Sequence, residues 1–214
     1  PIPSMVRTTV KSVFNFDSVG LMQILADMNE EQFAQAPVSY GGAINQGRRN
    51  LEVDFFGGEP LMNWDVVKQL VAYGRSLEKP NNKKFRFTLT TNGVLLNDEV
   101  MEFVNKEMSN VVLSLDGRKE VNDRMRPFRT GKGSYDLIVP KFQKLAESRN
   151  QTNYYIRGTF TRNNLDFSED VKHFADLGFK QMSIEPVVGP EEDPYSIREQ
   201  DLPQIMEEYD KLAL

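Results

Sequence analysis

Glycine and polar residues recur where short apolar stretches of the sequence end. Five such places are Gly57-Gly58-Glu59-Pro60, Thr90-Thr91-Asn92-Gly93, Ser114-Leu115-Asp116-Gly117, Arg157-Gly158-Thr159 and Glu185-Pro186. At the first, paired glycines leave backbone amides and carbonyls open to a ligand, because no Cβ blocks the approach. The carboxylate that follows suits an ammonium group. The same four residues also suit a tight strand-to-helix turn, so this place has two interpretations.

Two further places carry side chains that either bind a ligand or serve the fold. Ser114 and Asp116 are alternate residues at the end of an apolar stretch, so they either bind hydroxyl groups, such as those of a ribose, or cap the following helix. Asn92 precedes Gly93, a pair that is typical of an ordinary turn. The residue types alone leave these uses open.

Arg157 interrupts an otherwise apolar stretch. A guanidinium in such a position is costly unless a carboxylate pairs with it. That carboxylate belongs either to a ligand or to a neighbouring strand, where Asp54 and Glu185 are candidates. The sequence therefore predicts an ion pair at this position.

The elements that position these residues follow from the hydrophobic pattern. From Leu51 onward, short apolar stretches alternate with stretches of helical period, which is typical of β-α units that feed a mainly parallel sheet. The predicted strands are residues 51–56, 85–90, 111–115, 154–160 and 181–187. A first predicted helix begins near Asn63. A second follows an N-cap at Asn97 and has Met108 on its apolar face. Three more helices are predicted at residues 135–148, 167–177 and 199–214.

The first 47 residues form an atypical segment with a less regular pattern. Residues 6–16 alternate like a strand and residues 18–33 have a helical period, so they are predicted to add one more β-α unit. Six strands and six helices with right-handed crossovers make an open barrel or a doubly wound sheet. We expect a partial (β/α)6 TIM-type barrel whose first β-α unit lies in residues 1–47 and whose remaining units lie in residues 48–214. Ligands bind at the carboxyl ends of strands in such folds, where the five polar places lie.

Composition narrows the function classes. The 214 residues carry a formal net charge of −5, which argues against a general nucleic-acid binder. No stretch of 18 apolar residues predicts a membrane span, and the N-terminal residues lack the pattern of a signal peptide. We therefore expect a cytoplasmic protein that binds neither nucleic acid nor membrane.

The absence of cysteine is the most restrictive feature of the composition. With no cysteine and one histidine, His173, the chain can form neither a disulfide nor a zinc finger, and it cannot by itself hold a cysteine-ligated iron–sulfur cluster. We therefore assign no metal-ligating residues and no catalytic residue. The remaining chemistry is that of carboxylates, amides, hydroxyls and arginines.

Three motifs together resemble one enzyme family. They are residues 51–63, ending in Gly-Gly-Glu-Pro-Leu-Met-Asn, then Thr91-Asn92-Gly93, and then Leu113-Ser114-Leu115-Asp116-Gly117. In order and placement they resemble the radical S-adenosylmethionine (radical SAM) enzymes, in the SPASM-containing branch that modifies peptides. Within that branch the chain is most similar to maturases that form thioether crosslinks in Cys-rich ribosomal peptides. The resemblance covers residues 48–188 well and the rest poorly.

The resemblance implies a role for each matching residue. Gly57, Gly58 and Glu59, followed by Pro60, match the motif that holds the methionyl amine of S-adenosylmethionine. Asn92, Ser114 and Asp116 match strand ends that line its ribose and carboxylate, and Arg157 matches an arginine that pairs with the carboxylate. The basic connection, residues 118–132, has six Lys or Arg and either frames a peptide channel or is a solvated surface.

The chain departs from the family at the cluster. The family holds a 4Fe-4S cluster with CxxxCxxC, whereas Ser18, Met22 and Leu25 show the same spacing here and supply no thiolate. The Cys-rich SPASM region and the last barrel strands are also expected to be missing. Such a barrel has an open edge, which a partner or further chain is expected to cover.

Three explanations fit this departure. The chain is a fragment whose first 47 or so residues are scrambled relative to an active parent, or it is a non-catalytic relative that binds S-adenosylmethionine or a peptide as a scaffold. In the third explanation it has an unrelated α/β function, with a metal or phosphate site at Asp54, Asp116 and Glu185. We expect that the chain as written does not carry out the radical reaction.

Overall fold

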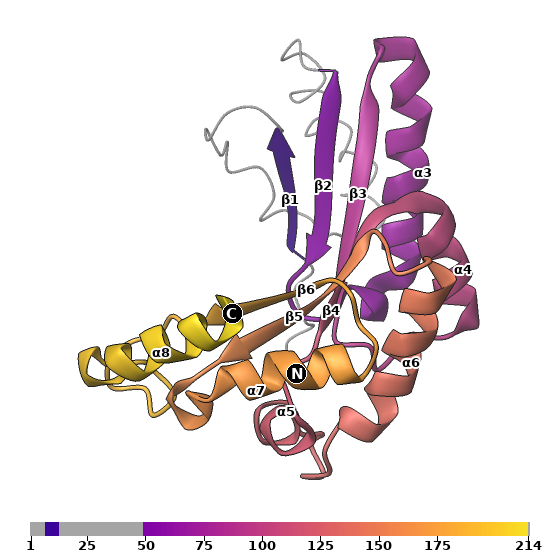
Figure 1. The fold of residues 1–214 in the computed structure, drawn as a ribbon. Coiled ribbons are helices and arrows are strands. Elements are labelled where there is room, and N and C mark those ends of the chain that lie inside the picture. Colours follow the sequence, from indigo (N-terminus) through magenta and orange to yellow (C-terminus); the bar gives the residue numbers. More distant parts are fainter. Residues whose placement is uncertain (1–6, 13–48, 214) are drawn as a thin grey trace. The chain divides into compact units, whose positions relative to one another are not determined.

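A computed structural model describes residues 7–12 and 49–213 of the chain (Figure 1). The strands are β1 (Arg7–Ser12), β2 (Asn50–Phe56), β3 (Lys84–Thr91), β4 (Met108–Ser114), β5 (Tyr154–Phe160) and β6 (Met182–Pro186). They follow one another in the sheet in chain order, and β2 to β6 run parallel. The predicted α/β class and mainly parallel sheet are therefore confirmed.

Helices connect these strands. The α-helices are α3 (Trp64–Asn81), α4 (Asp98–Glu107), α5 (Lys119–Met125), α6 (Tyr135–Ser148), α7 (Phe167–Asp176) and α8 (Leu202–Ala213). Short 3-10 helices are η1 (Pro60–Asn63), η2 (Arg162–Asn164) and η3 (Glu199–Asp201). The described residues divide into two compact units, one holding residues 7–12, 49–91 and 95–112, the other residues 92–94 and 113–213.

The first unit is built on β2 and β3, whose alternate residues are buried. The buried positions are Leu51, Val53, Phe55, Phe85, Phe87 and Leu89. Arg75 of α3 links this sheet to the helices, because its guanidinium donates to the Phe85 carbonyl (2.9 Å) and to the carboxylates of Glu78 (2.8 Å) and Glu107 (3.1 Å). Arg75 therefore fixes the start of β3 to α3 and to the end of α4.

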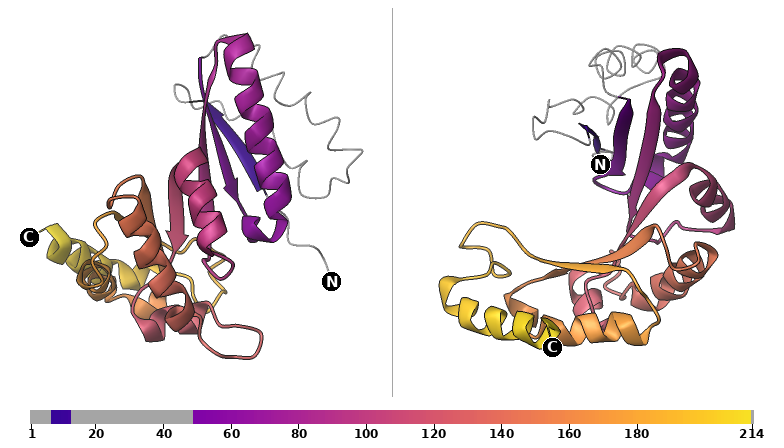
Figure 2. Two further views of the ribbon diagram at one scale, coloured as in Figure 1. Left: turned by 90° about the vertical axis from the view of Figure 1, so that its right-hand side faces the viewer. Right: turned by 45° about the horizontal axis from the view of Figure 1, so that its top comes forward.

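The second unit packs α7 and α8 against β5. Phe160 of β5 stacks on Phe167 of α7 with ring centroids 4.1 Å apart, and Ile205 of α8 completes the buried cluster. Both helices lie on the same side of β5 and β6 (Figure 2). The opposite side of these strands carries Arg157 and stays exposed.

A single carboxylate joins the two helices. Glu208 of α8 is buried, and it accepts hydrogen bonds from the backbone N–H and the hydroxyl of Ser168 in the first turn of α7. Lys211 donates to its other oxygen at 2.6 Å. Asp166 at the N-cap of α7 makes no side-chain cap bond, and Glu208 instead satisfies one amide of the first turn, that of Ser168.

Several sequence predictions needed correction. Met108 is the first residue of β4 rather than part of the preceding helix; its backbone is extended, and its buried side chain fits both patterns. Strand β1 pairs antiparallel with β2, so it is not the first parallel strand of a β-α unit. The expected last helix is divided into η3 and α8. The predicted helix at 18–33, with Ser18, Met22 and Leu25, lies outside the described residues.

Candidate functional site

The end of β2 is a sharp turn made by two glycines. Gly57 and Gly58 have φ values of 89° and 56°, a region that L-residues with a side chain rarely adopt. Glu59 then begins η1, and its buried Oε1 accepts from the Leu61 amide (3.1 Å) and from the Thr91 hydroxyl (2.9 Å). The turn interpretation therefore holds for these residues. The Glu59 carboxylate fixes the end of β2 to the end of β3 and orients the glycine backbone.

Asn92 and Gly93 also form a turn. The Asn92 side-chain oxygen accepts from the Val94 amide at 3.0 Å, and Gly93 has φ 79°. Lys141 of α6 donates to the Val94 carbonyl at 2.6 Å, which ties this turn to a helix of the second unit. Asn92 is half-buried at this strand end, as the sequence predicts.

Asp116 lies buried directly after β4 and is held by an arginine. Arg126 donates from Nε (2.7 Å) and from a terminal nitrogen (2.9 Å) to its two oxygens, and the Thr159 amide donates at 3.2 Å. Three of roughly four acceptor positions on this carboxylate are therefore occupied. The bidentate pair braces the ends of β4 and β5 and leaves little capacity for a ribose hydroxyl.

A second buried carboxylate supports the same strand end. Asp170 of α7 is fully buried and accepts from the Arg118 amide (2.9 Å), from Arg118 Nε (2.8 Å) and from the Asn164 side chain (3.1 Å). Burial lowers the Arg118 pKa, but the bonds to Asp170 and Asp166 outweigh this and raise it above its already high ordinary value. Gly117 lies against this carboxylate.

These contacts change the expected role of the basic connection. Arg118 and Arg126 are committed to buried carboxylates, so they stabilise the fold and are not free to bind a peptide. The segment between them is mostly α5, which the sequence pattern did not predict. Arg129 and Lys132 remain exposed.

Ser114 and Arg157 lie next to each other on adjacent strands. The Leu115 amide donates to the Arg157 carbonyl (3.1 Å), which in a parallel ladder places the preceding residue, Ser114, opposite Arg157. On the other side, Ser183 of β6 is the register partner of Arg157. Arg157 is thus a cation between two short hydroxyl side chains on the exposed face of the sheet.

The carboxylate partner of Arg157 is Glu185. Its Oε2 lies 2.5 Å from a terminal guanidinium nitrogen, and the side chains are 45% and 48% exposed. The predicted ion pair is confirmed, with Glu185 rather than Asp54 as the partner. The cost of burial is not its cause, however, since Arg157 faces outward from a strand whose other face is buried.

The eight predicted cofactor residues divide between the two units. Gly57, Gly58, Glu59 and Pro60 belong to the first, and Asn92, Ser114, Asp116 and Arg157 to the second. Within the second unit the structure brings Ser114 and Arg157 together. The supports Arg126, which is half-buried, and Asp170, which is buried, were not predicted, because no local sequence pattern links them to the strand ends.

No metal site replaces the cluster within residues 49–213. This part of the chain contains no group of three or more His, Asp or Glu arranged to hold a metal ion. Asp116 and Glu185, two members of the alternative metal site, are each paired with an arginine. His173 instead shares a 2.6 Å hydrogen bond with the Tyr135 hydroxyl.

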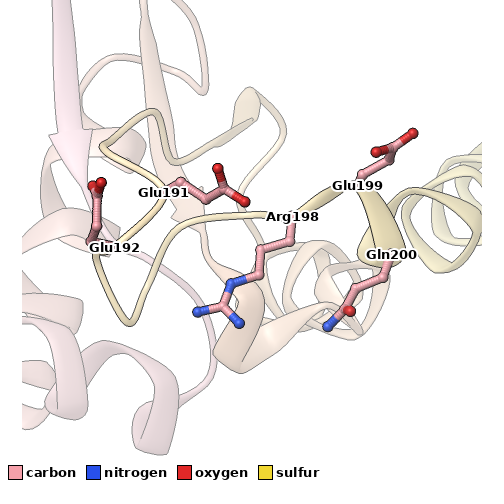
Figure 3. Close-up of a pocket in the computed structure, with 5 residues that line it drawn as sticks. All are labelled: Glu191, Glu192, Arg198, Glu199 and Gln200. Carbon is pink, nitrogen blue, oxygen red and sulfur yellow. The ribbon is translucent and has the colours of Figure 1, made fainter.

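A separate cavity lies between the loop after β6 and η3. It has a volume of about 760 Å³ and is lined by Glu191, Glu192, Arg198, Glu199 and Gln200 (Figure 3). All five side chains are exposed. The cavity includes none of the strand-end residues, so it is not the predicted cofactor site.

No helix in the described part of the chain is long and apolar enough to cross a membrane.

A family model described as the radical SAM superfamily matches residues 43–199. The chain belongs to the radical SAM superfamily. Relatives of this radical SAM chain include the cysteine-type anaerobic sulfatase-maturating enzyme of Clostridium novyi, 27% identical over 166 residues, which cover 74% of this chain and 44% of that protein. The radical SAM cyclopropyl synthase TigE of Paramaledivibacter caminithermalis is 26% identical over 133 residues, which cover 62% and 26%.

Solved structures show the same fold. The structure of anSMEcpe with bound AdoMet and Kp18Cys peptide matches 98% of this chain and 58% of that one, with 20% identity and a TM-score of 0.74. This likeness confirms the partial TIM-type architecture. The radical SAM chain spans less than half the length of the curated relatives it matches.

The family implies a 4Fe-4S cluster and S-adenosylmethionine, and the chain fits them unequally. A cluster of this type needs thiolate ligands, and the sequence contains no cysteine, so the residues present do not fit it. The first unit has a left-handed turn at Gly57-Gly58, and the second unit has the exposed guanidinium of Arg157.

Proposed function

We propose that this chain is the S-adenosylmethionine-binding part of a peptide-modifying radical SAM enzyme. In its cysteine-free form it binds the cofactor without cleaving it. The reaction of the parent enzyme is hydrogen abstraction from a Cys-rich ribosomal peptide followed by thioether formation, in the SPASM-containing branch. The motifs at residues 51–63, 91–93 and 113–117 support this assignment.

The observation that carries the proposal is the exposed arginine of β5. Arg157 stands between Ser114 and Ser183 on an open sheet face, and a guanidinium with free N–H donors binds a carboxylate in two-point geometry. Glycine amides at the end of β2 add donors and acceptors that no Cβ blocks. In this proposal Arg157 orients the carboxylate and the Gly57-Gly58-Glu59-Pro60 turn holds the amine, while Asn92, Ser114 and Asp116 line or brace the ribose side.

A peptide partner is supported by a relative that matures a sulfatase and by similar structures solved with a bound peptide. The anSMEcpe structures include one with a Cp18Cys peptide and one with a Kp18Cys peptide. We propose that the parent enzyme acts in the cytoplasm and that its substrate is a ribosomal peptide. A partner or further chain covers the open edge of the sheet.

A second candidate is favoured by the absence of cysteine. A radical SAM relative without cluster ligands can act as a scaffold that holds S-adenosylmethionine or a peptide for another protein. The first candidate predicts cofactor binding by this chain, and so does the second where the scaffold holds S-adenosylmethionine rather than a peptide. They differ in whether a longer form of the protein carries out the chemistry.

Calorimetric titration of S-adenosylmethionine into the purified chain tests the proposal. We expect saturable binding that Arg157→Ala weakens by about tenfold or more, since a charge-assisted hydrogen-bond pair is lost. Lys172→Ala is the matched control, because it removes one positive charge from an exposed ion pair on α7 with a similar N–O distance of 2.7 Å. No binding to protein shown by circular dichroism to be folded would refute the proposal.

A further inference from the structure

The ion pair on the exposed face of β5 and β6 uses only one nitrogen of the Arg157 guanidinium. Only one guanidinium nitrogen of Arg157 contacts Glu185, and the structure gives the Arg157 side chain no other hydrogen bond among the described residues. A guanidinium has five N–H donors and holds a carboxylate most firmly through two of them. Glu185 therefore occupies only a small part of the hydrogen-bond donors of Arg157.

Glu185 reaches Arg157 from a diagonal position. In the parallel register Arg157 lies opposite Ser183, while Glu185 lies opposite Thr159, two residues further along β6. The Ser183 hydroxyl donates to the other Glu185 oxygen at 3.4 Å. The carboxylate thus sits beside the guanidinium, on the same face where a ligand would approach.

We propose that Glu185 competes with the carboxylate of the ligand for Arg157. In the free chain Glu185 occupies the guanidinium, and it yields this place when a ligand with an α-carboxylate binds. An exposed ion pair contributes little stability, so a ligand carboxylate that makes two hydrogen bonds displaces it. A ligand without a carboxylate leaves the pair intact. Glu185 is then a specificity-determining residue; this inference rests on the proposed function.

Three adenosine compounds separate the carboxylate from the rest of the ligand. S-adenosylmethionine and S-adenosylhomocysteine carry an α-carboxylate, and 5′-methylthioadenosine carries none. We expect Glu185→Gln to tighten binding of the first two by about two- to fivefold, which corresponds to the loss of one exposed ion pair. The affinity for 5′-methylthioadenosine should not change.

Glu169→Gln is the matched control variant. Glu169 pairs with Lys172 on α7 at 2.7 Å, and these side chains are 50% and 56% exposed. The substitution removes the same charge from a comparable pair in the same unit, so it should leave all three affinities unchanged. In the Arg157→Ala background, Glu185→Gln should no longer tighten binding, because the contested cation is gone.

Two results would overturn this inference while the proposed function stands. One is S-adenosylmethionine binding that depends on Arg157 but is unchanged or weakened by Glu185→Gln, which would make Glu185 a supporting residue. The other is an equal gain for all three compounds, which would indicate a general charge effect. If folded wild-type chain binds none of the three compounds, the proposed function fails and this inference fails with it.

Discussion

Replacing Gly117 with alanine tests how the end of β4 is held. Gly117 has φ 153°, and a Cβ built on it would lie 2.4 Å from both Cγ and Oδ1 of Asp170. Asp170 cannot move without cost, because it is fully buried and accepts three hydrogen bonds from Arg118 and Asn164. Backbone strain of about 1–3 kcal/mol and overpacking of about 1–3 kcal/mol together predict that the free energy of unfolding falls by about 2–6 kcal/mol.

Urea unfolding followed by circular dichroism measures this loss. Gly131→Ala is the control, since Gly131 also has a positive φ (80°) but no atom lies within 4 Å of a Cβ placed there. That variant should show strain alone, about 1–2 kcal/mol. Gly117→Ala should cost less in an Asp170→Ala background than in the wild type. Equal losses for Gly117→Ala and Gly131→Ala would refute the reasoning.

Two further predictions concern pH and the cluster. Burial raises the pKa of Glu208, but hydrogen bonds from Lys211 and Ser168 outweigh it and lower the pKa below its ordinary 4.5. Glu208→Gln should therefore cost about 1–3 kcal/mol of unfolding free energy at neutral pH, and the difference should vanish as the pH falls through the lowered pKa; a difference that persists in acid would contradict this. Anaerobic reconstitution with iron and sulfide should leave the chain colourless and unable to produce 5′-deoxyadenosine, because it has no thiolates. Brown protein with cluster absorbance would contradict that expectation.

The sequence predicts local structure best where the signals are local. Helix α6 and strand β5 have the predicted bounds, and Asn97 caps α4 by accepting from the Val100 amide at 2.9 Å. Strand β1 pairs against the predicted direction because pairing is set by partners distant in sequence. Helix α5 lies in a run of charged residues with a weak apolar pattern, so hydrophobic periodicity does not predict it.

The candidate site is predicted in its residues more than in its contacts. The strand-end positions of Asn92 and Ser114 follow from the strand pattern. Arg157 instead lies in the middle of β5, and its pairing with Glu185 follows from parallel neighbours. The environment of Asp116 does not, because Arg126 returns to it from the far end of α5. Contacts of this kind depend on the path of the chain.

The bond between Glu208 and α7 has a consequence for the order of folding. Ser168 and Glu208 are 40 residues apart in sequence, so this bond closes a long loop and forms only after its entropy cost has been met elsewhere. Until α8 docks, the first turn of α7 lacks its acceptor and the Phe160–Phe167 pair lacks Ile205. We therefore expect the first turn of α7 and the whole of α8 to form and open together, late in the folding of the second unit.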